Sequence, residues 1–137
     1  MKIHYTLALL FGALLISVAA SSQDIQTSTI EWNCTSTFTA RPGTTADEIT
    51  KVVSSSDQVI WYDKDGVVIK TLSITDTTGS WSNVSGTGTI QFGITSGDDA
   101  GLVQFSRSNG VARIRIQLIN GDDSQIYELV VDNLHAL

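Results

Sequence analysis

The sequence contains few of the residues that form covalent cross-links or acid–base catalytic groups. It has one cysteine and two histidines in 137 residues. Cys34 cannot form a disulfide within the chain, and we expect it to be a buried, reduced thiol. His4 lies in an N-terminal apolar segment and His135 near the last residue, which leaves no histidine pair for a nucleophilic triad or a zinc cluster. We therefore expect no cofactor and no enzymatic activity.

Basic residues are also scarce. Eight lysines and arginines stand against fourteen aspartates and glutamates, and the formal net charge is −6. A chain with this charge repels phosphate backbones. We therefore expect no nucleic acid among its partners.

Long apolar runs are absent except at the N-terminus. Residues 7–18 form an apolar run that follows Lys2 and precedes the small residues Ala19 and Ala20. This order is typical of a signal peptide, and the run is too short to span a bilayer comfortably. The sequence thus predicts a secreted or periplasmic protein with no stable membrane span after cleavage. The expected organisation is a signal peptide at 1–20, a polar leader at 21–28 and a single all-β domain at 29–134.

The strongest pattern that is present lies in residues 87–133, where apolar and polar side chains alternate in four successive segments. A period of two places successive side chains on opposite faces of a strand. The segments therefore predict a C-terminal four-strand antiparallel meander with one apolar face. Its apolar positions are Ile90, Phe92, Ile94, Val103, Phe105, Ile114, Ile116, Leu118, Tyr127, Leu129 and Val131.

Turn residues predict the register of this meander. Asn109-Gly110 is a two-residue hairpin signal and places Phe105 opposite Ile114. A tight turn near Gly121-Asp122 places Leu118 opposite Tyr127. Both hairpins bring their apolar residues to the same face.

The N-terminal half predicts the partner of this sheet. Residues 29–40 form a strand whose apolar face carries Cys34 and Phe38, and residues 58–63 and 67–74 form a hairpin. One short helix is expected near residues 46–54, because Thr45 and Glu48 have capping-box spacing. A strand is the alternative there, since the segment is rich in β-branched residues. Residues 79–88 form a connection that crosses between sheets.

These elements predict an all-β fold of about seven to eight antiparallel strands, arranged as a sandwich or a small barrel. The expected core includes Val67 and Ile69 from the N-terminal half. The runner-up is an α+β roll in which the short helix covers a curved sheet.

Two acidic turns are the candidate metal site. Asp98-Asp99 and Asp122-Asp123 each follow a glycine, and an even number of strand reversals places both turns at one end of the sheet. Carboxylates gathered there have the chemistry that calcium prefers. Glycine and aspartate are also ordinary turn residues, so we expect solvated turns without a specific calcium site.

Three aromatic residues are the candidate ligand-binding residues. Trp61 and Tyr62 are adjacent in a predicted strand and must point to opposite faces, and Trp81 lies in the connection that follows. Exposed planar rings stack on sugars or apolar ligands. Core filling is the competing interpretation of all three.

The sequence therefore favours an exported, non-enzymatic binding domain for a small apolar or carbohydrate ligand. The alternative is a structural or adhesion module of the cell envelope, which acts on an envelope protein or glycan through a sheet face or edge. A carboxylate-based hydrolase is the third hypothesis.

Overall fold

The computed structural model describes residues 24–40, 43–46 and 50–137. They form nine strands, and this part of the chain contains no helix. Every strand pairs antiparallel with its neighbours. The strands are β1 (Ile30–Thr39), β2 (Thr44–Ala46), β3 (Thr50–Ser54), β4 (Gln58–Tyr62), β5 (Val68–Ser80), β6 (Gly88–Ser96), β7 (Asp99–Ser108), β8 (Val111–Asn120) and β9 (Asp123–Ala136).

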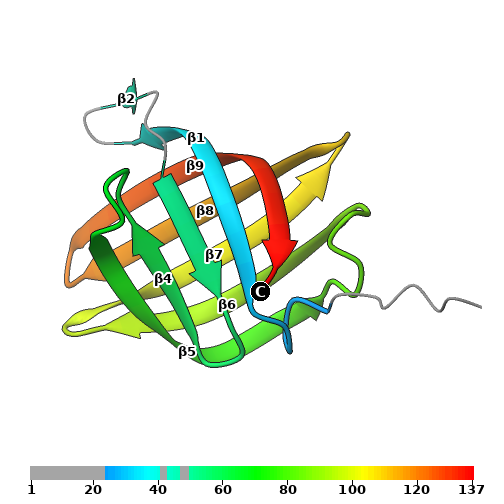
Figure 1. The fold of residues 1–137 in the computed structure, drawn as a ribbon. Helices are drawn as coiled ribbons and strands as arrows, with labels where there is room; N and C mark the ends of the chain where they lie inside the picture. The colour runs from blue at the N-terminus through cyan, green and yellow to red at the C-terminus, as the bar shows by residue number, and fades with distance from the viewer. Residues whose placement is uncertain (1–23, 41–42, 47–49) are drawn as a thin grey trace, which may run out of the picture.

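Eight of these strands close into a barrel (Figure 1). From β1 through β3 to β9 each strand pairs with the next, and β9 pairs back with β1. The closing pair runs from Ile30 opposite Ala136 to Thr39 opposite Tyr127. The three-residue β2 lies beside the last residues of β1. The all-β prediction is confirmed, and closure makes the fold a barrel rather than a sandwich.

The prediction of a short helix near residues 46–54 is wrong for residues 50–54, which the structure describes as a strand. Residues 50–54 are β3, which lies between β1 and β4 with Val52 opposite both Trp32 and Trp61. Burial alternates along this strand, and Thr50, Val52 and Ser54 point into the barrel. The strand that we gave as the alternative is therefore the correct interpretation. The β-branched residues of this segment favour it, because they pack well on a pleated surface. Residues 47–49 lie outside the described part of the chain.

Two further expectations about the N-terminal half are corrected. The connection at 79–88 does not cross between sheets, because β5 continues to Ser80 and residues 81–87 join two neighbouring strands of one sheet. Val67 and Ile69 are 61% and 43% exposed instead of buried, since Val67 precedes β5 and the inward side chains of this part of β5 are those of Lys70 and Leu72.

An irregularity in β1 changes which side chains face the interior. The register with β9 shifts between Asn33 and Ser36. Cys34, which lies within this irregularity, is buried as predicted, but after it Thr37 is buried and Phe38 is 38% exposed. An extra residue in one strand reverses the alternation that follows. The prediction of Phe38 in the core is therefore wrong.

The C-terminal meander is confirmed, with one change of register. Phe105 lies opposite Ile114 as predicted. Leu118 lies opposite Gln125, two residues before Tyr127. The reason is that Gly121-Asp122 alone form the turn, with Gly121 at a φ of 58°, a conformation that glycine adopts without strain. A shift of two residues keeps every side chain on its predicted face.

Aromatic rings and a chain segment fill one end of the barrel. Phe105 lies 4.7 Å from Trp32 and 5.9 Å from Phe92, measured between ring centroids. Residues 24–28 lie at the same end, where Ile25 is fully buried and its amide donates to the carbonyl of Trp81. We call this the closed end.

Trp81 itself is part of the closed end. Its ring lies 6.0 Å from that of Trp32, and only 3% of the residue is exposed. Gly88 lies against the same ring, and a Cβ there would overlap the indole. The absence of a side chain at Gly88 thus lets Trp81 pack inward.

Candidate functional site

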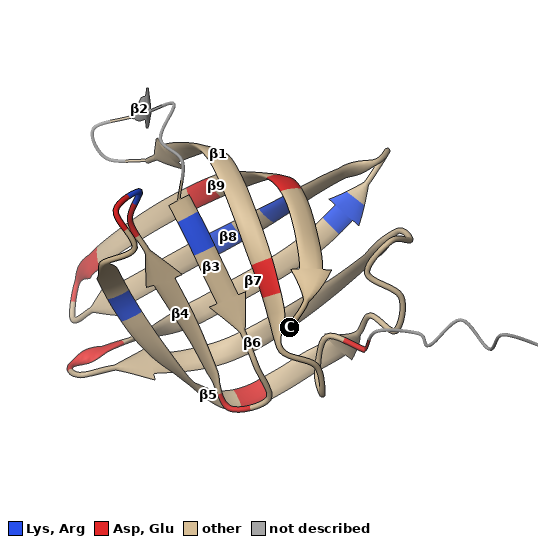
Figure 2. Ribbon diagram, in the orientation of Figure 1, with Lys and Arg blue, Asp and Glu red and all other residues tan. Residues whose placement is uncertain are grey.

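The opposite end of the barrel, which we call the mouth, carries the turns at 63–67, 97–98 and 121–122 (left in Figure 1). The two acidic turns therefore lie at the same end, as the count of strand reversals predicted. Figure 2 shows acidic residues gathered in these mouth turns.

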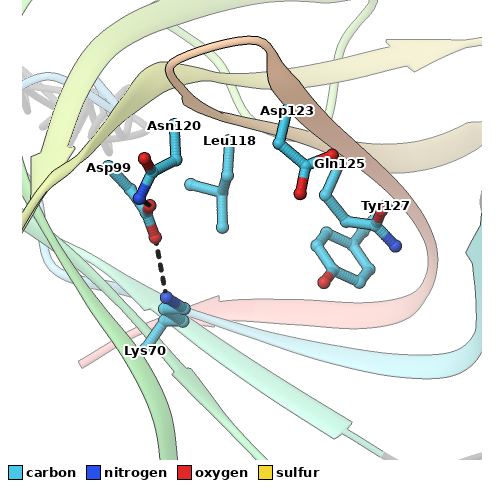
Figure 3. A pocket seen from close by; sticks show the side chains of 7 residues that line it. All are labelled: Lys70, Asp99, Leu118, Asn120, Asp123, Gln125 and Tyr127. Atoms are coloured by element: carbon cyan, nitrogen blue, oxygen red, sulfur yellow. Dashed lines mark hydrogen bonds and ion pairs between the residues drawn. The ribbon is translucent and has the colours of Figure 1, made fainter.

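A cavity of about 330 Å³ opens at the mouth (Figure 3). Each of its polar residues continues the inward alternation of a strand beyond the last apolar position: Asn120 follows Leu118 in β8, and Lys70 precedes Leu72 in β5. Leu118 lies between two groups of side chains. Asp99 and Asn120, with Lys70, form the first group, and the residues from β9 form the second. The cavity is lined by Lys70, Asp99, Asn120, Leu118, Asp123, Gln125 and Tyr127.

The first group is a hydrogen-bonded triad on three strands. Lys70 Nζ donates to Asp99 Oδ2 at 3.0 Å, and Asn120 Nδ2 donates to Asp99 Oδ1 at 3.0 Å. The Lys70 and Asp99 side chains are 36% and 21% exposed, so the pair remains in contact with solvent. The Lys70 ammonium and then the Asn120 amide hold the pKa of the Asp99 carboxyl below its usual value of 3.8. Asp99 is therefore ionised at neutral pH.

The lowered pKa predicts how this carboxyl titrates. A depressed folded-state pKa contributes stability above about pH 4 that is lost as the pH falls through the folded-state value. Replacing Lys70 with methionine removes the larger cause, so the Asp99 pKa should rise toward its ordinary value. Carbon-13 NMR of the carboxyl measures this, and Lys64→Met, in an exposed mouth turn, is the matched control. Equal Asp99 titration curves in wild type and Lys70→Met would contradict the assignment.

The second group combines an aromatic ring with hydrogen-bonding side chains from the start of β9. Asp123, Gln125 and Tyr127 occupy alternate, inward-facing positions of that strand. The Tyr127 ring lies edge-on to that of Trp61, with 5.1 Å between centroids. Trp61 is 5% exposed and is not among the residues that line the cavity. The mouth thus has a polar rim and an apolar, aromatic floor.

The three aromatic residues predicted to bind ligand do not lie together. Trp61 is next to the mouth, whereas Trp81 is at the closed end and donates from Nε1 to the carbonyls of Asn83 and Gly86. Tyr62 points outward, and the Lys51 ammonium lies 4.9 Å from its ring centroid. The expectation that Trp61 and Tyr62 point to opposite faces agrees with their burial.

The four aspartates of the candidate metal site divide into two pairs. Asp99 and Asp123 line the cavity, while Asp98 and Asp122 are exposed in the turns. Within the described ranges, no group of three or more histidine, cysteine, aspartate or glutamate side chains is placed to hold a metal ion. The absence of a specific calcium site stays a prediction.

Sequence reasoning missed Lys70, Asn120 and Gln125 and assigned Tyr127 to the core. A usable signal existed, because each of these residues continues the period-two pattern of an inward face. An inward position that becomes polar near a turn is typical of a barrel rim.

The fold and the mouth define a class of protein: an antiparallel barrel with one end packed and a small polar cavity at the other. Comparisons with models of protein families, with curated proteins and with solved structures gave no significant match. The part of the chain that the structure describes has no helix long and apolar enough to cross a membrane.

Proposed function

We propose that the protein is an exported, non-enzymatic binding domain that holds a small carbohydrate-type ligand in its mouth. The observation that supports this most is the lining of the cavity, where carboxylates and amides surround one aromatic ring. Sugars present hydroxyl groups to such side chains and an apolar ring face to an aromatic plane. The cavity of about 330 Å³ is at the small end of the usual range for ligand sites.

A carbohydrate fits this barrel better than a long apolar ligand. The interior beyond the mouth is filled by Trp32, Phe92 and Phe105, which pack ring against ring. An apolar chain would have to displace these packed rings and pass a charged rim first. The cost of both steps favours a compact polar ligand that stays near the mouth.

The other two hypotheses have less support. Among the described strands, closure of β1 on β9 leaves only the three-residue β2 as an edge strand, so an envelope adhesion module would have to act through an outer face or through this short edge. A carboxylate-based hydrolase finds two carboxylates in the cavity, Asp99 and Asp123. Lys70 keeps Asp99 ionised, which suits a base and not the proton donor that such enzymes need.

Calorimetric titration tests the proposal with glucose, N-acetylglucosamine, maltose and cellobiose as probes and palmitate as the apolar comparator. We expect one of the sugars to bind. Tyr127→Ala and Gln125→Ala should each weaken that binding at least about tenfold, since they remove a stacking ring and a hydrogen-bonding amide.

Gln104→Ala is the matched control for Gln125→Ala, because Gln104 lies on the outer face of β7 and is absent from the mouth lining. It should leave the affinity unchanged. Binding of palmitate alone, or of none of the sugars at millimolar concentration, would contradict the proposal. Release of product from a nitrophenyl glycoside, lost in Asp99→Asn, would favour the hydrolase instead.

A further inference from the structure

Trp61 differs from the other two tryptophans in its hydrogen bonding. Trp32 Nε1 donates to Ser54 Oγ at 2.9 Å, and Trp81 Nε1 donates to the carbonyl of Asn83 at 2.7 Å. Trp61 Nε1 is buried and has no partner. A buried indole N–H nearly always finds an acceptor, so an unpaired one requires an explanation.

A second unpaired group belongs to the same region. Thr37 is 8% exposed, and its Oγ1 is buried without a partner. Thr37 lies opposite Leu129, two residues from Tyr127, on the strand that closes the barrel against β9. The strands β1 and β3 lie between β9, which carries Tyr127, and β4, which carries Trp61. Thr37 and Trp61 are therefore on the part of the barrel wall between β9 and β4, together with the buried Thr50 hydroxyl, which lies beside the Cys34 thiol.

Tyr127 is in contact with both the cavity and Trp61. Moving the Tyr127 ring toward solvent would connect the indole N–H with the cavity. This movement breaks one edge-on aromatic interaction and exposes apolar ring surface, and the hydrogen bonds and contacts of a bound ligand would offset that cost.

The charges of the mouth limit what can enter. Its lining has one cation, Lys70, which is already bonded to Asp99, and a second carboxylate on Asp123. An anionic ligand would meet net negative charge there. An ammonium group would suit the carboxylates but offers the indole N–H no acceptor. A neutral molecule with several hydroxyl oxygens meets both requirements.

In a refinement that rests on the proposed function, we propose that Trp61 and Thr37 form a deeper subsite for a neutral, hydroxyl-rich ligand. The ligand displaces the Tyr127 ring from Trp61. It then places an oxygen within hydrogen-bond reach of Trp61 Nε1 and the Thr37 hydroxyl. The mouth residues hold the remainder of the ligand.

Two variants test this, because one of them separates an effect on binding from an effect on folding. Thr37→Val removes an unpaired hydroxyl from the free protein at nearly constant shape, so the thermal midpoint should stay unchanged or rise. Trp61→Phe also replaces a buried indole by a smaller ring, so its midpoint should fall. Each should weaken binding of the sugar that binds wild type by about three- to tenfold, as one ligand hydrogen bond is removed. Calorimetry and thermal unfolding measure the two effects on the same samples.

The controls are Trp81→Phe and Thr71→Val. Trp81→Phe removes an indole that has acceptors, so it should lower the midpoint and leave the affinity unchanged. Thr71 is exposed on β5, and Thr71→Val should change neither quantity.

The outcomes separate the two proposals. If wild type binds none of the four sugars, the proposed function fails and this subsite fails with it. If a sugar binds wild type and both variants equally, the mouth site stands and the deeper subsite is wrong. A midpoint that falls clearly in Thr37→Val, which keeps the shape of the side chain, would overturn the subsite without any ligand, since it would show that the Thr37 hydroxyl already has a partner.

Discussion

Replacing Phe105 with alanine is expected to lower the free energy of unfolding by about 3 to 5 kcal/mol. Phe105 is fully buried and packs against the rings of Trp32 and Phe92. Removing it leaves a cavity between side chains that belong to three different strands of a closed barrel, so the walls relax only in part. Urea unfolding followed by tryptophan fluorescence and by far-ultraviolet circular dichroism measures the change.

Two controls accompany this variant. Gln104→Ala changes the neighbouring outward-facing residue of the same strand and should cost little. Asn109→Ala should lower the free energy of unfolding by about 1 kcal/mol or less. Asn109 has a positive φ of 53°, which asparagine tolerates better than alanine, but the substitution removes no core packing. A decrease below about 1 kcal/mol for Phe105→Ala would show that the ring is not part of the core.

The second large effect is an alkaline loss of stability that depends on Cys34. Burial raises the pKa of the Cys34 thiol from 9.0 to about 12, and the nearby Thr50 hydroxyl opposes this only weakly. A raised folded-state pKa contributes stability that is fully present below the unfolded value and is lost as the pH rises toward the folded value. The unfolding free energy should therefore decline from about pH 9 upward, by up to about 4 kcal/mol at the highest pH.

Denaturant unfolding at about pH 8 and about pH 10.5 measures this decline, which the pKa values place at about 2 kcal/mol over that interval. Cys34→Ala has its own packing cost, which is the same at both pH values, and it should lose about 2 kcal/mol less than wild type between them. The two proteins differ only at residue 34, so the difference between their declines isolates the thiol. Equal declines, or rapid labelling of the native thiol by a disulfide reagent, would contradict its burial.

The sequence predicted the fold where local pattern and turn chemistry agree. Ile114 and Ile116 alternate with Arg113 and Arg115, and this alone placed β8 correctly in a meander. The irregularity at Cys34 could not be foreseen, because each neighbouring residue is consistent with unbroken alternation. The capping-box spacing at Thr45 and Glu48 misled because tertiary pairing of β3 outweighs a weak local helix signal.

The candidate site was less predictable because its contacts form only when the barrel closes. Lys70 and Asp99 are 29 residues apart and lie on strands that do not pair with each other. Trp61 was selected for its ring, but its unpaired N–H depends on what surrounds it in three dimensions. Tyr127 was assigned to the core on correct alternation, and only its position near the start of β9 makes it part of the mouth.

The pairing of β1 with β9 also constrains the order of events in folding. Ile30 meets Ala136, so the first and last strands of the barrel must find each other across almost the whole chain. The hairpins from β3 to β8 can form as they are synthesised. The edges of β1 and β8 that pair with β9 remain open until β9 is in place. Such open edges recruit strands from other molecules. This protein should therefore be slow to fold and most vulnerable to self-association just before closure, so that a chaperone protecting the unclosed barrel would raise the yield of native protein more than one acting on any single hairpin.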